Sequence, residues 1–152
     1  GKILAATADG GVVLLDVTSP GRPGTLLEVP EGNTSGISFS RDGTILFTGA
    51  TASVRGGSHF AAFAAAKNGL RAVAQSMARE LGPKGIHVAH VVIDGMIDSA
   101  ATRSRFPERV KDLGPDAMLG TDAIAELYFQ IHAQPRTAWT FKADLRPWAE
   151  KF

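Results

Sequence analysis

The first third of the chain has a different pattern of apolar and polar positions from the rest. Before residue 43, apolar residues gather in four short runs separated by glycine, proline, asparagine and aspartate. The pair Asp9-Gly10 between the first two runs is typical of a hairpin turn. The pattern therefore predicts an antiparallel β-meander over residues 1–43. Its strands are expected at Lys2–Thr7, Val12–Val17, Leu26–Val29 and Ser35–Ser40.

From about residue 44 the pattern changes to short strands that alternate with helical segments. Residues Ser58–Leu81 are rich in alanine, which is the strongest helix former. Ser58 is expected to cap the start of this helix, and Gly82-Pro83 to end it. Apolar side chains recur at steps of three, four and seven, which places them on one stripe of a helix. The stripe consists of Phe63, Leu70, Val73, Met77 and Leu81.

The segment Ile86–Ile93 is apolar except for His87 and His90, as a strand buried inside a parallel sheet tends to be. Together with a strand near residue 45, this segment predicts a strand-helix alternation of the βαβ kind. The remaining elements are expected to be a loop with a short helix at 98–120, a helix at Thr121–Gln134 and a strand at Thr137–Leu145.

One spacing in this α/β part points to chemistry. Phe63 lies thirteen residues after Ala50, and Lys67 lies four residues after Phe63. The run from Ala66 to Val88, AKNGLRAVAQSMARELGPKGIHV, closely resembles the helix and strand that follow the active site of the short-chain dehydrogenase/reductase family. The endings TAWT and LRPW resemble those of atypical members of that family. Residues 43–152 thus resemble the family's C-terminal half.

The resemblance implies where the catalytic residues would stand. The family carries a serine at the end of a strand and a Tyr-x-x-x-Lys motif on the next helix. Ala50 then occupies the serine position, Phe63 the tyrosine position and Lys67 the lysine position. Reduction of a carbonyl needs a group that gives a proton to the substrate oxygen, and phenylalanine and alanine have none to give. Lys67 is kept and could bind a ribose hydroxyl. We therefore expect a catalytically impaired relative, without enzymatic activity in this chain alone.

Two alternatives remain open. Thr51, Ser53, Ser58 and His59 lie close in sequence to the vacated positions, and His59 is the one that titrates near neutral pH. In the first alternative the protein is an active NAD(P)-dependent oxidoreductase, in which Lys67 works with Thr51 or His59. In the second it is a non-catalytic protein-interaction module.

NAD(P) is implied by the family resemblance only. The family's N-terminal half carries a glycine-rich turn that brings the backbone close to a pyrophosphate. Gly49, Gly56 and Gly57 have the wrong spacing for such a turn and follow the active-site strand. The dinucleotide-binding half is therefore expected to be missing, so no cofactor is predicted to bind tightly. Lys67 is the one candidate cofactor-binding residue.

The β-rich segment has a resemblance of its own. The run SGISFSRDGTIL resembles the first hairpin of a WD40-like β-propeller blade, and GKILAA recurs as GTILFT 42 residues later. We therefore predict a blade-like segment over residues 1–48 and a chimera-like or truncated protein. The predicted fold class is α/β, with a partial Rossmann-like β-α-β-α-β part at 44–152 preceded by the antiparallel meander at 1–43.

The composition of the chain argues against several kinds of partner and site. A net charge of +1 gives no strong attraction to nucleic acid or to an anionic membrane. The absence of cysteine excludes disulfides and thiolate zinc sites, and the four histidines lack metal-ligand spacing, so no metal is expected. No apolar run reaches the length of a membrane span and no secretory signal precedes the strands, so a cytoplasmic protein is expected.

The protein is expected to form a homo-oligomer. The helix Ser58–Leu81 carries small residues that permit close helix approach, and an incomplete sheet leaves strand edges that can pair with another chain. The small residues are Ala65, Ala66, Ala72 and Ala74.

Overall fold

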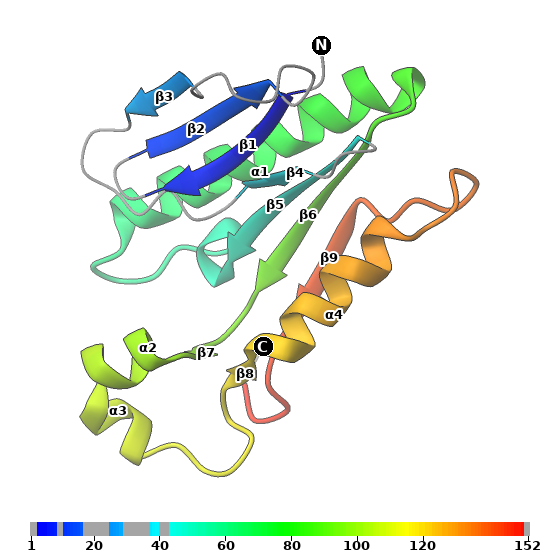
Figure 1. Ribbon diagram of the computed structural model, residues 1–152. Helices are drawn as coiled ribbons and strands as arrows, with labels where there is room; N and C mark the ends of the chain where they lie inside the picture. Colours follow the sequence, from blue (N-terminus) through cyan, green and yellow to red (C-terminus); the bar gives the residue numbers. More distant parts are fainter. Residues whose placement is uncertain (1–2, 9–10, 17–24, 29–36, 40–42, 151–152) are drawn as a thin grey trace.

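The computed structural model describes residues 3–8, 11–16, 25–28, 37–39 and 43–150 (Figure 1). The strands β1 (Ile3–Ala8), β2 (Gly11–Asp16) and β3 (Thr25–Glu28) form a separate sheet in which neighbours run antiparallel. These strands match three of the four expected near the N-terminus, and the connecting segments lie outside the described residues.

The fourth strand belongs to a different sheet. β4 (Ile37–Phe39) pairs antiparallel with β5 (Thr44–Ala50) rather than with β3. A propeller blade would require this strand to continue the first sheet, so the blade interpretation of residues 1–48 finds no support. The boundary between residues 43 and 44 stays a prediction, although β4 lies before it and shares a sheet with β5.

The second sheet has the order β4-β5-β6-β9 and is parallel apart from its β4 edge. Its remaining strands are β6 (His87–Ile93) and β9 (Lys142–Leu145). The helix α1 (Ala61–Leu81) connects β5 to β6, and α4 (Thr121–His132) precedes β9. Parallel strands joined through helices confirm the predicted partial Rossmann-like α/β fold.

The helices α1 and α4 cover opposite faces of this sheet (Figure 1). Consecutive residues of a strand point to opposite faces, so neighbouring residues of β5 pack against different helices. Ile45, Phe47 and Val88 pack with Ala74 of α1. On the other face, Leu46 of β5 packs in one cluster with Ile131 of α4. The remaining buried members of that second cluster are Ala89, Val91, Ile93 and Leu119.

The start of α1 corrects the sequence-based prediction. The helix begins at Ala61, its N-cap is Phe60 without a side-chain hydrogen bond, and Ser58 lies exposed in the preceding turn. The turn closes through the Phe60 N–H, which donates to the carbonyl oxygen of Gly57, and His59 has a positive φ of 69°. Ser58 therefore does not cap the helix, and the predicted helix Ser58–Leu81 is three residues too long.

The region 98–120 is more ordered than expected. Besides α3 (Pro107–Lys111), it contains α2 (Ala100–Arg105), whose N-cap Ser99 accepts a hydrogen bond from the Thr102 N–H. Short parallel strands β7 (Ile97–Asp98) and β8 (Leu119–Gly120) close the region. Two 3-10 turns, η1 (Thr51–Ser53) and η2 (Gly82–Lys84), follow β5 and α1.

Among the described residues, no helix combines the length and apolar character needed to cross a bilayer.

Candidate functional site

The three family positions meet where β5 ends and α1 begins. Phe63 and Lys67 lie one helical turn apart, and the Lys67 Nζ stands 5.9 Å from the centroid of the Phe63 ring. The Phe63 side chain is 46% exposed, so it faces solvent as a reactive side chain at this position would. Ala50 is the last residue of β5. The structure thus places the Lys67 side chain beside the end of β5 that carries Ala50.

The Lys67 side chain is hydrogen-bonded to the backbone of β5. Its Nζ donates a hydrogen bond of 3.1 Å to the carbonyl oxygen of Thr48. Desolvation by partial burial lowers the pKa of the Lys67 ammonium below its ordinary value. A positively charged donor beside a carbonyl oxygen makes a stronger hydrogen bond than a neutral one, so this contact fixes the side chain against β5.

Two more side chains of α1 bind the turn after β5 in the same way. The Asn68 Nδ2 donates to the carbonyl oxygen of Ala52 over 2.8 Å, and an Arg71 terminal nitrogen donates to that of Ser53 over 3.4 Å. Lys67 and Arg71 are four residues apart and therefore share a helix face. Three side chains of α1 thus hold the end of β5 and η1 against the helix by hydrogen bonds, namely Lys67, Asn68 and Arg71.

The hydroxyl groups of Ser53 and Thr51 also form hydrogen bonds within the protein. Ser53 is fully buried, and its Oγ accepts the Ala50 N–H over 3.0 Å. The Thr51 Oγ1 donates to Asp94 Oδ1 over 2.6 Å. Both hydroxyls thus stabilise the turn that follows Ala50.

Asp94 is the centre of a buried ionic cluster that the sequence did not reveal. Its side chain is 5% exposed and follows β6 directly. One oxygen lies 3.3 Å from a terminal nitrogen of Arg146, and the other lies 4.0 Å from one of Arg55. With Thr51, this cluster joins the ends of β5 and β6 to the segment after β9. An Asp-Gly pair after a buried strand was the available signal, and it indicated only a turn.

His59 lies apart from Lys67 in the hydrogen-bond pattern of the described residues. It lies exposed in the loop before α1, and among the described residues no hydrogen bond or ion pair joins it to Lys67. The histidine that does lie near the site is His90, which the sequence analysis treated only as a strand residue.

His90 is fully buried, and neither ring nitrogen has a hydrogen-bond partner among the described residues. Its ring lies against Gly49: a Cβ at that glycine would stand 2.6 Å from His90 Nε2 and 2.9 Å from Ser53 Oγ. Burial lowers the pKa of the imidazole, and the nearby charges of Arg71 and Lys67 lower it further. The imidazole is therefore kept neutral directly behind the vacated site.

No group of three His, Asp or Glu side chains that could hold a metal ion occurs in the described part of the chain.

Comparison with known families gives one match. The family model described as enoyl-(acyl carrier protein) reductase matches residues 34–127. No curated protein matches the chain.

Several solved structures are similar to this chain, among them the following two. A short-chain dehydrogenase from Rhodopseudomonas palustris is 50% identical over 70% of this chain, with a TM-score of 0.50. The apo short-chain oxidoreductase from Pseudomonas aeruginosa PAO1, described as containing an atypical catalytic center, is 23% identical over 73% of this chain, with a TM-score of 0.56. The matches span 39% and 48% of those two proteins, so this chain corresponds to less than half the length of either.

Proposed function

Because the chain belongs to the short-chain dehydrogenase/reductase family, we propose that it is a catalytically impaired member, in which the active-site scaffold persists without its proton donor. The observation that carries this proposal is the pair Phe63 and Lys67. A ring with no O–H stands where the proton donor would stand, and the lysine beside it is bound to the Thr48 carbonyl oxygen. The role left to Lys67 is to hold β5 against α1.

Tight binding of NAD(P) is not part of this proposal. The family resemblance implies that cofactor, and Lys67 is the residue that would contact its ribose. The residues present fit it poorly. A dinucleotide site needs parallel strands whose following turns receive the phosphates. The strand beside β5 is instead β4, which runs antiparallel, and β1 to β3 form a separate antiparallel sheet. This arrangement also supports a chimera-like origin, in which a β-rich segment replaces the family's dinucleotide-binding half.

The first test asks whether the scaffold still has the geometry of the family's site. In a Phe63→Tyr variant the new phenol would stand near the Lys67 ammonium, which favours its ionised form. We expect the pKa of that phenol to fall by about one unit, because an opposite charge within a few ångströms lowers it. The phenolate absorbance as a function of pH measures this. The same substitution in a Lys67→Met background is the matched control and should remove the shift.

The second test is catalytic. The wild-type chain should oxidise neither NADH nor NADPH in the presence of small aldehydes and ketones above the rate of a heat-denatured sample. Turnover that disappears in Lys67→Met would overturn the proposal. An unshifted phenol pKa in the first test would instead show that the scaffold itself is not family-like, so the two failures are distinguishable.

One observation supports the active-enzyme alternative with Thr51. Its hydroxyl donates a hydrogen bond to a buried carboxylate, Asp94, and could therefore accept a proton from a substrate alcohol while passing its own to Asp94. This alternative predicts measurable oxidoreductase turnover in the wild type that is lost in Thr51→Val and kept in His59→Asn.

We also propose that the protein self-associates through α1. Phe63 and Val73 are 46% and 50% exposed. Of the four small residues expected to permit close helix approach, Ala65, Ala66 and Ala72 are exposed, whereas Ala74 is buried in the core and was wrongly included. An exposed apolar stripe of this kind favours helix-helix packing. Sedimentation velocity should show a dimer or larger species at micromolar concentration, and Val73→Glu should shift it to monomer. A monomer across that range in the wild type would contradict self-association.

A further inference from the structure

The amino end of β6 lacks a neighbour on one side. β6 begins at His87, but β9 pairs with it only from His90 onward, where the register places Lys142. Beside His87, Val88 and Ala89, no strand of the described residues continues the sheet in that direction. The segment 139–141 passes there instead, and its backbone contacts β6 through the carbonyl oxygens of Thr140 and Phe141, which accept hydrogen bonds from His87 Nε2 and the His90 N–H.

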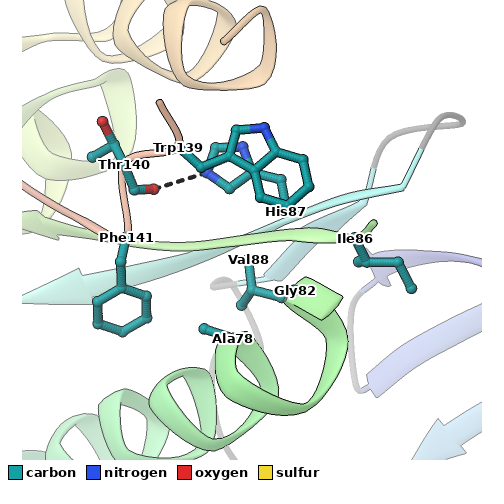
Figure 2. Close-up of a pocket in the computed structure, with 8 residues that line it drawn as sticks. All are labelled: Ala78, Gly82, Ile86, His87, Val88, Trp139, Thr140 and Phe141. Carbon is teal, nitrogen blue, oxygen red and sulfur yellow. Dashed lines mark hydrogen bonds between the residues drawn. The ribbon is translucent and has the colours of Figure 1, made fainter. Parts of the chain in front are cut away.

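This arrangement leaves a cavity of about 160 Å³ between the segment, β6 and the end of α1 (Figure 2). Figure 2 shows Trp139 and His87 on one side of β6, with Val88, Phe141 and Ala78 on the other. The last three belong to or pack against the core cluster under α1. The cavity is therefore continuous with an apolar core and opens at the edge of the sheet.

Most polar groups of His87 and Thr140 in the lining form hydrogen bonds within the protein. The His87 Nε2–H donates to the carbonyl oxygen of Thr140 over 2.8 Å, and the N–H of Thr140 donates to the Gln134 side chain over 2.7 Å. The Thr140 hydroxyl accepts from the same glutamine over 2.8 Å. His87 Nδ1 is buried without a hydrogen-bond partner among the described residues. The lining contains no Asp, Glu, Lys or Arg side chain, so a strongly charged ligand would lose its hydration without an opposite charge to compensate.

Three of the lining side chains carry aromatic rings. His87 and Trp139 are stacked on one side of β6, with their ring centroids 4.8 Å apart and their planes 2° from parallel, and the Phe141 ring lies on the other side. Aromatic walls favour aromatic guests through offset or edge contacts as well as through burial. The volume fits a single ring, since an apolar cavity of about 150 Å³ accepts benzene. We propose that this cavity binds an uncharged monocyclic aromatic molecule.

The proposed site is separate from the vacated one. Ala78 lies eleven residues after Lys67 on α1, which is about 16 Å along a helix. The cavity also lies at the amino end of β6, whereas Ala50 and Asp94 lie at the carboxyl ends of β5 and β6. The inference therefore does not depend on the proposed loss of catalysis.

Trp139 reports on the cavity directly. The chain has two tryptophans, and Trp148 is 80% exposed and outside the lining, so a Trp148→Phe background leaves Trp139 as the sole reporter. Titration with toluene should change the Trp139 emission along a saturable curve. Methylcyclohexane has a similar size but is neither flat nor aromatic, and it should bind about tenfold more weakly.

Filling the cavity supplies the matched control. Ala78→Phe places a ring into the space from α1, and Ala125→Phe makes the same change at an exposed position of α4. The first variant should weaken toluene binding at least about tenfold, and the second should leave it unchanged. Toluene should also raise the melting temperature of the parent and the Ala125→Phe protein, because a ligand that binds only the folded state stabilises it.

Three results would overturn the proposal. The Trp139 emission could stay constant up to the solubility of toluene in a folded protein, toluene and methylcyclohexane could bind equally, or Ala78→Phe could bind toluene as well as Ala125→Phe does. If Ala78→Phe fails to fold, the comparison of toluene with methylcyclohexane in the Trp148→Phe protein still decides the matter.

Discussion

The two ends of the parallel strands β5 and β6 are built in opposite ways. At the carboxyl ends, side chains from α1 and from the segment after β9 bind backbone oxygens and the buried Asp94 carboxylate. At the amino end of β6, aromatic and aliphatic side chains surround an incompletely filled space. Polar groups that hydrogen-bond to one another thus order the carboxyl ends of the strands, whereas the late start of β9 beside β6 leaves a hollow at the amino end.

The largest effect is expected at Asp94. Asp94→Ala would leave the guanidinium of Arg146, which is 21% exposed, without this buried carboxylate, and Thr51 without its acceptor. Removal of one partner of a buried ion pair costs about 3–5 kcal/mol of unfolding free energy. Urea denaturation measures the loss. The matched control is Asp98→Ala, which breaks the more exposed pair with Arg103 and should change stability little. Equal losses of unfolding free energy in Asp94→Ala and Asp98→Ala would contradict the conclusion that the Asp94 cluster stabilises the carboxyl ends of β5 and β6.

The next effect is expected at Gly49. Gly49→Ala introduces a Cβ that would lie 2.6 Å from His90 Nε2 and 2.9 Å from Ser53 Oγ, both on fully buried side chains. Overpacking of this kind costs about 1–3 kcal/mol. Gly69→Ala is the control, because nothing lies within 4 Å of a Cβ at that exposed helical position. The helix propensity of alanine should make the control neutral or stabilising. A Gly49→Ala protein as stable as the wild type would show that His90 does not press on β5.

A smaller effect is expected at Lys67. Lys67→Met keeps much of the aliphatic side chain but removes the hydrogen bond to the Thr48 oxygen. Because the group is only partly buried, we expect a loss of about 1 kcal/mol rather than the larger value for a buried charged donor. Lys84→Met, which removes an exposed pair with Glu80, is the control. A Lys67→Met variant without any stability change would leave the lysine available for another role.

The smallest effect concerns pH. The pKa of His90 is lowered in the folded protein by burial first, and then by Arg71 and Lys67; Asp144 raises it and Lys142 lowers it. The unfolded chain therefore binds more protons on this residue once the pH falls below the ordinary histidine value of about 6.5. Stability should decrease as the pH falls from there, with a slope of at most about 1.4 kcal/mol per pH unit from this group, and should level off above it. Denaturation curves between pH 5 and pH 8 (roughly the histidine range) measure this dependence.

His59→Asn is the control for the pH prediction, because His59 is exposed. Its profile should match that of the wild type, whereas His90→Asn should flatten it. An unchanged slope in His90→Asn would assign the pH dependence to other groups.

Local pattern predicted the elements with strong periodicity. The alanine-rich sequence of α1 and the apolar run of β6 contain enough signal to fix their type. The assignment of Ala50, Phe63 and Lys67 as site residues stays a prediction. The helix start was wrong because Ser58 looks like an N-cap in sequence, while the turn that Phe60 and Gly57 close delays the helix to Ala61.

The features that the sequence did not predict depend on contacts between residues far apart in the chain. The pairing of β4 with β5 instead of β3 is decided by which sheet edge is available, and no local pattern records it. Asp94 and Arg146 are 52 positions apart in the sequence, and the cavity exists because β9 begins later along the sheet than β6. The importance of His90 likewise follows from its contact with Gly49, which side-chain identity alone does not reveal.

The central claim is that Lys67 has become part of the scaffold and no longer serves a nicotinamide cofactor. Isothermal titration of the full chain with NADH and with NADPH tests it most directly, with Lys67→Met titrated in parallel. We expect no saturable heat for either nucleotide in either protein. Saturable binding to the wild type that is lost in Lys67→Met would contradict it.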